Sequence, residues 1–150
     1  MELKIMKLSD IRNLKNFCNA LDSDPCYRTV LDNVLAEYND FEVDNVRFIK
    51  ASEIDNIQVE DLESDAYRLG CFKSEFLAHI TGVDFSLIDI IQESEGYEKL
   101  GEWLINEGHT KQIQQEYARL DGYGHHFNRY DSSEEEITID GIDYYVFDNY

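Results

Sequence analysis

The sequence predicts a single α+β domain spanning residues 1–150, in which five or six helices precede a small C-terminal antiparallel sheet. Apolar residues recur at helical spacing through the first 120 residues, and they alternate around Asp140-Gly141 near the end. With one proline and no linker-like stretch, the chain offers no domain boundary. Its 43% hydrophobic content exceeds that of a disordered acidic chain.

Two helices are predicted within the first 40 residues. Ser9 is expected to cap a helix that runs to about Asp22. Asp24-Pro25 predicts the start of a second helix, because proline is favoured directly after an N-cap residue. We expect these helices to form a hairpin, followed by an extra strand at Val46–Lys50.

The middle of the chain predicts more helices. Residues 53–65 are acidic and are expected to form a short helical turn and a loop, and residues 65–81 a helix that ends at Gly82. Asp84 is expected to cap the next helix. Apolar residues lie on more than one side of that helix, which predicts a central position: Leu87, Ile88, Ile90 and Ile91. Two further helices are expected to end near Gly108 and Gly122.

The C-terminal segment predicts a β-hairpin. Asp140-Gly141 between alternating strands is typical of a type I′ turn, which requires two residues with positive φ. This turn pairs Ile137 with Tyr144 and Ile139 with Ile142, and places Val146 on the same core face. Residues 125–130 are expected to supply a third strand, because an isolated hairpin is only marginally stable.

Charge is the strongest functional signal. The chain has 32 acidic and 13 basic residues, a net charge of −19, of which residues 1–50 contribute only −2. Solubility requires a net charge of only about 2–8 in magnitude, and excess charge destabilises a compact fold by self-repulsion. Nucleic acid and anionic membranes would be repelled, so we expect a basic partner, no direct nucleic-acid contact and no membrane contact. The oligomeric state stays open.

Three acidic clusters are the candidate partner-binding residues. Glu95, Glu98 and Glu102 are expected to share one helix face, and Glu134, Glu136 and Asp143 one face of the hairpin. Tyr145 and Phe147 are expected to be exposed aromatic anchors. The cluster that comes first in the chain contains Glu60, Asp61, Glu63 and Asp65, and Glu93 extends the cluster of Glu95, Glu98 and Glu102.

Duplex DNA carries about one negative charge per 1.7 Å of helix axis. In size, charge and aromatic richness the chain resembles the DNA-mimic proteins of phages and plasmids, such as ArdA-like antirestriction proteins and some anti-CRISPR proteins. The resemblance implies a non-enzymatic phage or plasmid inhibitor of a nucleic-acid-binding restriction or CRISPR enzyme, acting in the host cytoplasm. It involves no motif, so no site residue is transferred by it.

Residues 74–93 resemble a repressor-type helix-turn-helix, with Ala78 as the small residue of the first helix and Gly82 at the turn. The positions that would face DNA include Asp84 and Asp89 and contain no Lys or Arg, so DNA reading does not carry over. The alternative function is therefore a non-enzymatic regulator that binds protein through a degenerate helix-turn-helix.

A third alternative is a small metal-dependent enzyme at His125 and His126, near Asp121 and Asp131. Adjacent residues of a strand point to opposite faces, so we expect the two histidines not to share a metal ion. The sequence contains no nucleophile elbow, P-loop or His-Glu-x-x-His motif, so we also expect no cofactor and no catalytic residue. The cysteines lack metal-site spacing and are expected to be buried, reduced thiols: Cys18, Cys26 and Cys71. The N-terminus lacks the apolar core of a signal peptide and no segment is apolar enough to span a membrane, so we expect a cytoplasmic protein.

Overall fold

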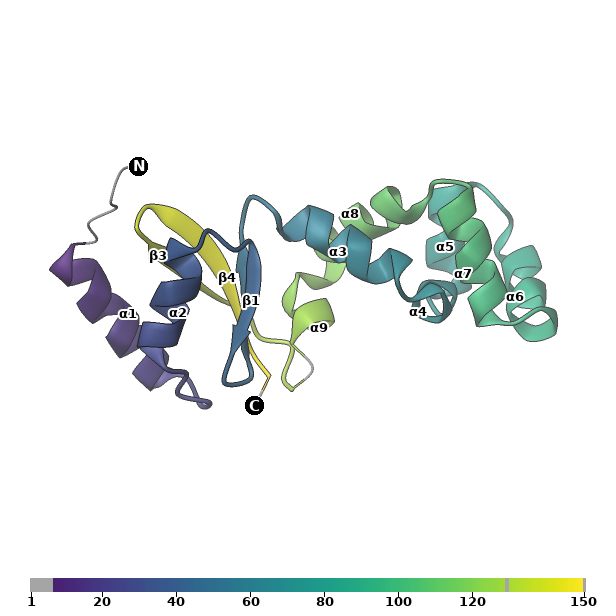
Figure 1. The fold of residues 1–150 in the computed structure, drawn as a ribbon. Helices are drawn as coiled ribbons and strands as arrows, with labels where there is room; N and C mark the ends of the chain where they lie inside the picture. The colour runs from purple at the N-terminus through teal and green to yellow at the C-terminus, as the bar shows by residue number, and fades with distance from the viewer. Residues whose placement is uncertain (1–6, 129, 150) are drawn as a thin grey trace. The chain divides into compact units, whose positions relative to one another are not determined.

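The computed structural model describes residues 7–128 and 130–149. Within them the chain forms nine helices and a four-stranded antiparallel sheet, so the predicted α+β class is confirmed and the predicted number of helices is too low (Figure 1). The chain divides into two compact units: unit 1 comprises Met1–Ile54 and Asp121–Tyr150, and unit 2 comprises Asp55–Leu120. The number of domains stays a prediction.

Unit 1 contains the sheet and three helices. Its elements are α1 (Leu8–Ala20), α2 (Tyr27–Leu35), β1 (Asp40–Val43), β2 (Val46–Lys50), α9 (Gly124–Phe127), β3 (Glu135–Ile139) and β4 (Ile142–Asp148). Unit 2 is helical, and two of its helices begin or end one residue across the boundary. Its elements are α3 (Ile54–Glu63), α4 (Ala66–Gly70), α5 (Ser74–Thr81), α6 (Phe85–Ser94), α7 (Tyr97–Asn106) and α8 (Thr110–Asp121).

The sheet has the strand order β1-β2-β4-β3 and is built from two hairpins. At the predicted turn, Asp140 has φ 54° and Gly141 has φ 76°, and Ile137 pairs with Tyr144 as expected. The expected strand at Val46–Lys50 is present and pairs with β4. Its hairpin with β1 was not predicted, although Asp44 and Asn45 also have positive φ in its two-residue turn.

Helices lie on both faces of the sheet within unit 1. In Figure 1, α1 and α2 lie on one side of the sheet and α9 on the other. The core on the α1–α2 side contains Leu14, Cys18, Val30, Val34, Phe41, Val43, Val46, Phe48, Ile139, Tyr144 and Val146. On the α9 side, the Phe127 ring lies 5.1 Å from the Phe147 ring, and the Arg47 guanidinium 4.9 Å from the Phe127 ring.

The strand expected at residues 125–130 is therefore wrong. Gly124–Phe127 form α9, and residue 129 lies outside the described residues. A Cβ on Gly124 would come 2.1 Å from the Ser132 carbonyl oxygen, so the chain approaches itself too closely here for any larger residue. Because β1 and β2 complete the sheet, the C-terminal hairpin does not need a strand from this segment.

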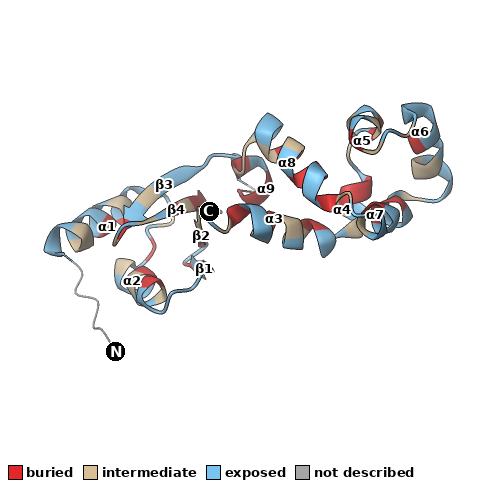
Figure 2. Cartoon of the chain, turned by 90° about the horizontal axis from the view of Figure 1, so that it is seen from above, coloured by how far each residue is buried: buried red, intermediate tan, exposed pale blue. Residues whose placement is uncertain are grey.

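Unit 2 packs around one helical core, whose buried residues are Leu62, Leu69, Leu77, Ile80, Ile88, Leu100, Leu104, Ile113 and Tyr117. Its tightest contact joins α4 and α7. A Cβ on Gly70 would lie 1.7 Å from the Tyr97 carbonyl oxygen, and one on Gly101 would lie 1.7 Å from that of Ala66. Only glycine permits this reciprocal approach of two helix backbones. In Figure 2, buried residues lie on α3, α4, α7 and α8, whereas α6 is mostly exposed.

The helix predicted over 65–81 is two helices, α4 and α5, separated at residues 71–73. Gln92 stabilises the break, because its Nε2 donates hydrogen bonds to the carbonyl oxygens of Gly70 at 2.8 Å and Phe72 at 3.0 Å. Conversely, the turn and loop predicted over 53–65 are one helix, α3. Ile54, Gln58 and Leu62 recur every four residues and all are buried, which is the pattern of one helix face.

Two predicted helix starts are wrong. Ser9 lies inside α1, because the amides of Asp10 and Ile11 already bond to the Lys7 carbonyl, and the helix ends at Ala20. Asp24 has φ 44° and its amide donates to the Leu21 carbonyl, so it closes a turn and does not cap α2. Cys26 is the N-cap residue of α2, and its carbonyl accepts the first helical bond from Val30.

The cysteines also differ from expectation. All three are free thiols, but only Cys18 is buried, and Cys26 and Cys71 are exposed. Burial raises the pKa of Cys18 to about 11. Across residues 7–128 and 130–149, no helix has the length and apolar composition needed to cross a membrane.

Candidate partner-binding surfaces

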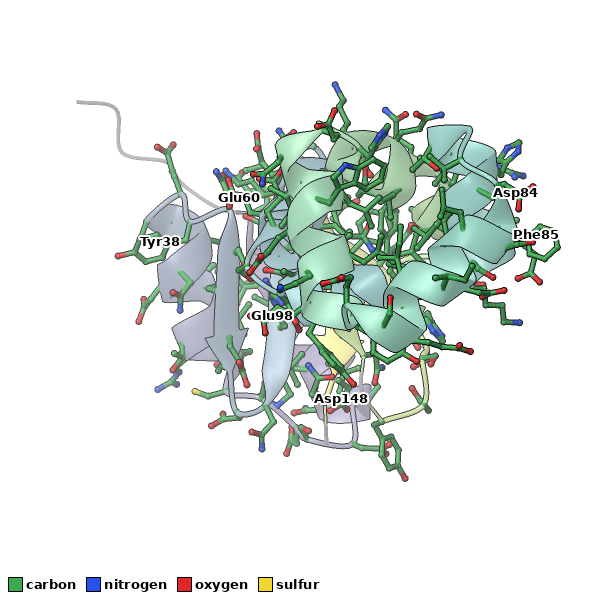
Figure 3. The ribbon with its side chains drawn as sticks, turned by 90° about the vertical axis from the view of Figure 1, so that its right-hand side faces the viewer. Tyr38, Glu60, Asp84, Phe85, Glu98 and Asp148 are labelled. Atoms are coloured by element: carbon green, nitrogen blue, oxygen red, sulfur yellow. The ribbon has the colours of Figure 1, made fainter. Side chains whose placement is uncertain are left out.

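The first acidic cluster lies on α3 and at the start of α4. Glu60 and Glu63 are exposed and form no ion pair with another described residue, and Asp61 is half-buried. Asp65 has a structural role as the N-cap of α4, since its Oδ1 accepts from the Arg68 amide at 3.1 Å. This cluster therefore presents two exposed carboxylates to a partner, those of Glu63 and of Glu60, which Figure 3 labels.

The second cluster does not lie on a single helix. Gly96 has φ 95° and separates α6 from α7, so Glu95 is the C-cap residue of α6, and the predicted face of three glutamates is wrong. Glu98 and Glu102 do share one face of α7, four residues apart, and both are exposed. Glu95 pairs with Lys99 at 3.6 Å, while Glu93 is exposed on α6.

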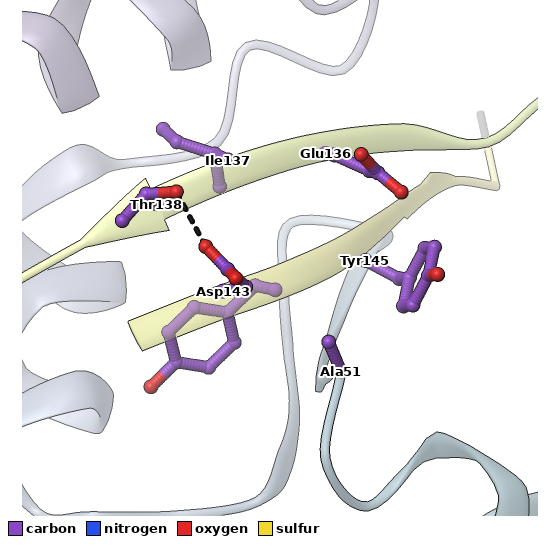
Figure 4. Close-up of a pocket in the computed structure, with 7 residues that line it drawn as sticks. Ala51, Glu136, Ile137, Thr138, Asp143 and Tyr145 are labelled. Carbon is purple, nitrogen blue, oxygen red and sulfur yellow. Dashed lines mark hydrogen bonds between the residues drawn. The ribbon is translucent and has the colours of Figure 1, made fainter. Parts of the chain in front are cut away.

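In the third cluster, Glu134 has a structural role, whereas Glu136 and Asp143 are exposed. Glu134 precedes β3, and its Oε1 accepts from the amides of Tyr123 at 3.2 Å and Gly124 at 3.3 Å. Glu136 and Asp143 lie on one face of the hairpin, as predicted, and line a pocket of about 400 Å³ (Figure 4). The pocket lining consists of Ala51, Glu136, Ile137, Thr138, Asp143, Tyr144 and Tyr145.

Inside this pocket, Asp143 already has a partner, because the Thr138 hydroxyl donates to its Oδ1 at 2.6 Å. Tyr145 is half-buried and its ring lies 5.0 Å from the Tyr123 ring. Phe147 is 0% exposed, so its predicted role as an exposed anchor is wrong. The alternation rule places Phe147 away from the α1–α2 core, but α9 covers that face as well.

The predicted helix-turn-helix segment forms two helices, α5 and α6, joined by Gly82–Asp84. Gly82 ends α5 in the left-handed region, and Asp84 caps α6 by accepting from the Ser86 amide at 2.8 Å, both as expected. The predicted central position of α6 is wrong. Ile88 is buried, whereas the side chains on the outer side are about half exposed: Phe85 47%, Leu87 50% and Ile90 58%.

The histidine pair lies on α9 and not on a strand. His126 is buried against Phe127, with ring centres 4.6 Å apart, and His125 is exposed. Hydrogen bonds from Ser133, and then from Asn128, hold the pKa of Asp131 below its usual value, so this carboxylate stabilises its loop. In the part of the chain that the structure describes, no three His, Cys, Asp or Glu side chains are close enough to hold a metal ion.

The negative charge divides almost evenly between the two units. Unit 2 has 14 acidic and 5 basic residues, a net charge of −9, and unit 1 has 18 and 8, a net charge of −10. The sequence had placed most of the charge after residue 50, a division that the fold does not follow, because unit 1 combines the nearly neutral N-terminal segment with the acidic C-terminal one. No family model, curated protein or solved structure matches this chain.

Proposed function

We propose that this protein is a non-enzymatic inhibitor of a nucleic-acid-binding host-defence enzyme, of the restriction or CRISPR type, and that it competes with DNA by presenting DNA-like negative charge. It would act in the cytoplasm of a host cell that carries a phage or plasmid. The partner is a basic nucleic-acid-binding protein or complex, with no cofactor required.

Exposed carboxylates without a counter-charge carry this proposal. Glu60, Glu63, Glu93, Glu98 and Glu102 are all exposed, and none forms an ion pair within residues 7–128 and 130–149. An isolated protein gains no stability from such unpaired charges and loses some by self-repulsion. A basic groove that binds phosphates would recover that energy on association.

The expected mechanism is competitive occupancy of the groove. A net charge of −19 attracts a basic partner over roughly the Debye length, about 10 Å at 0.1 M salt, and so accelerates association. Because salt screens exposed charges, inhibition should weaken as ionic strength rises. Each mimic occupies one groove, so inhibition should require about one inhibitor per enzyme. An inhibitor that acted as a catalyst would not show this stoichiometry.

The experiment is a DNA-cleavage assay with purified restriction and CRISPR enzymes, run at about 50 and 300 mM salt, where screening differs strongly. The triple variant Glu93→Lys, Glu98→Lys and Glu102→Lys reverses three unpaired charges of unit 2. We expect its inhibition constant to rise at least about tenfold at the lower salt, since each lost charge pair weakens association by a fraction of the total.

The matched control replaces the same three residues by aspartate, which keeps the charge and shortens each side chain by one carbon. This variant should inhibit almost as well as the wild type, at a cost of a few tenths of a kcal/mol in helix propensity. Equal inhibition by the lysine variant and the wild type, at both salt concentrations, would falsify DNA mimicry by unit 2.

A further inference from the structure

The outer side of α6 carries an apolar surface that the DNA-mimic proposal does not use. We define the α6 ridge as Leu87, Ile90 and Ile91, which lie three and four residues apart and therefore share one side of the helix. Leu87 and Ile90 are 50% and 58% exposed, while Ile91 packs against the core of unit 2. Phe85 adds a further exposed ring at the first turn, where it points outward beside Asp84 (Figure 3).

The ridge is bordered by acid and by no basic side chain of its own segment. Residues 74–95 contain five acidic residues and no Lys or Arg. On α6, Glu93 lies three residues after Ile90 and so borders the ridge, while Asp89 lies one turn before Glu93 and further round the helix; neither forms an ion pair with a described residue. An occupant of this surface must therefore combine apolar side chains with positive charge.

We propose that the α6 ridge is a docking site for a cationic amphipathic helix of a partner protein. Side chains spaced three and four residues apart form a row that fits into the groove of a second helix. The partner's apolar face would cover Leu87 and Ile90, while its Lys or Arg residues would lie beside Asp89 and Glu93. Helix-in-groove recognition of this type depends on a few apolar anchors and uses charge for orientation.

The same features exclude nucleic acid as the occupant. Asp84 and Asp89 take positions that would face DNA in a helix-turn-helix protein, and phosphates would be repelled from them. An exposed apolar surface also contributes nothing to a purely electrostatic mimic. The inference therefore goes beyond the proposed function and does not depend on DNA mimicry.

The test uses a synthetic, fluorescently labelled helical peptide of about 18 residues, a length at which helices begin to form in water. It carries Leu along one face and Lys elsewhere, and a scrambled peptide of identical composition is the control. Binding to the full-length protein is measured by fluorescence anisotropy at about 50 and 300 mM salt. We expect the amphipathic peptide to bind at least about tenfold more tightly than the scrambled one, a difference that persists at high salt because apolar contacts are not screened.

Three variants of the protein identify the surface. Leu87→Gln with Ile90→Gln keeps good helix formers but removes the apolar row, and should abolish the preference for the amphipathic peptide. Asp89→Asn with Glu93→Gln should weaken binding of both peptides at low salt only. Leu120→Gln removes an equally exposed leucine, 57% exposed on α8, and should change nothing.

Equal binding of the two peptides by the wild type would overturn the proposal, as would a preference that survives in the Leu87→Gln, Ile90→Gln variant. Sedimentation of the same proteins tests the competing occupant. A wild-type dimer that this variant converts to a monomer, without any peptide preference, would assign the ridge to a second copy of the chain. None of these measurements involves a DNA-processing enzyme, so they are independent of the cleavage assay.

Discussion

Units 1 and 2 carry nearly the same negative charge, but each is stabilised internally by a different kind of contact. Unit 1 is a sheet with helices on both faces, whose aromatic rings pack across strands: the Phe41 ring stacks on that of Phe48 at 5.1 Å and meets that of Tyr144 edge-on at 6.0 Å. Unit 2 has no strand among its described residues, and its tightest contact is the reciprocal approach of Gly70 and Gly101 to neighbouring backbones. Large exposed apolar side chains are also more frequent in unit 2, which includes Phe85, Leu87 and Ile90.

The two units therefore have similar net charge but differ in the contacts that stabilise them. Hairpin turns and alternating apolar residues specify most of unit 1, where a close approach of two backbones occurs at Gly124, against the loop at Ser132. In unit 2 the close approach at Gly70 and Gly101 joins two helices of the core, so an added methyl group on α7 should disrupt that core. Trp103 is the chain's one tryptophan and lies on α7, so its fluorescence reports unit 2 separately.

The largest effect is expected from Gly101→Ala. Its Cβ would lie 1.7 Å from the Ala66 carbonyl oxygen, a backbone atom that only a shift of α4 against α7 can move away. Overpacking of this kind costs about 3 kcal/mol of unfolding free energy, the upper end of the usual range. Urea unfolding followed by Trp103 fluorescence should show the loss.

The control for that variant is Gly82→Ala, where an added Cβ meets nothing within 4 Å and only the left-handed φ of 76° is unfavourable. Its cost should be about 1 kcal/mol. If both glycine variants unfold at the same urea concentration, close backbone contact is not what holds unit 2 together.

A smaller and opposite effect is expected in unit 1 from Tyr144→Phe. Tyr144 is 1% exposed and its hydroxyl has no hydrogen-bond partner among the described residues, so removing the oxygen should stabilise the protein by about 1 kcal/mol. Burial raises the pKa of Tyr144, so the folded state opposes ionisation and its stability is lost as pH rises above about 10, the pKa of unfolded tyrosine.

Urea unfolding at pH 8 and at about pH 10.5 checks both parts of this prediction, because only the higher value ionises the unfolded tyrosine. The variant should be the more stable protein at pH 8, and its advantage should grow at the alkaline pH. A loss of stability at pH 8 would mean that the hydroxyl has a partner, and would contradict the packing described for this core.

The β1–β2 hairpin should respond still less, to Asn45→Gly. Asn45 has φ 69° at the second position of the Asp44-Asn45 turn, where glycine is the preferred residue. A gain of about 0.5 kcal/mol in thermal unfolding is expected, because glycine relieves the left-handed strain but adds chain entropy to the unfolded state. Asn45→Val, which is β-branched, should instead destabilise the hairpin, and the opposite order would contradict the turn assignment.

The smallest perturbation is chemical labelling of the thiols. Hydrogen bonds from Thr29, and then from Arg28, lower the pKa of Cys26, and this thiol is exposed at the start of α2. Cys18 is buried with a pKa of about 11. Mass spectrometry after iodoacetamide at pH 7.5 should find Cys26 modified well before Cys18, and similar rates in urea, where both have an ordinary thiol pKa of about 8.5.

The sequence determined the features that depend on neighbouring residues. The Asp140-Gly141 turn, the register of Ile137 with Tyr144, and the Asp84 cap of α6 were all predicted, because each follows from a local backbone requirement. The strand at Val46–Lys50 was also predicted from its own composition. The sequence also supplied the net charge, from which the class of partner is inferred.

The tertiary structure decided which faces of these elements are buried and which are exposed to solvent. Periodicity placed Leu87 and Ile90 in a core, but α6 packs through Ile88 and leaves them exposed, and α9 buries Phe147 on the face expected to be free. The sequence likewise did not show which acidic side chains are exposed and unpaired. Glu134 accepts hydrogen bonds from the amides of Tyr123 and Gly124, while Glu98 is exposed to solvent. Burial depends on segments far apart in the chain, so a local pattern identifies a helix or strand but does not determine which of its faces is covered.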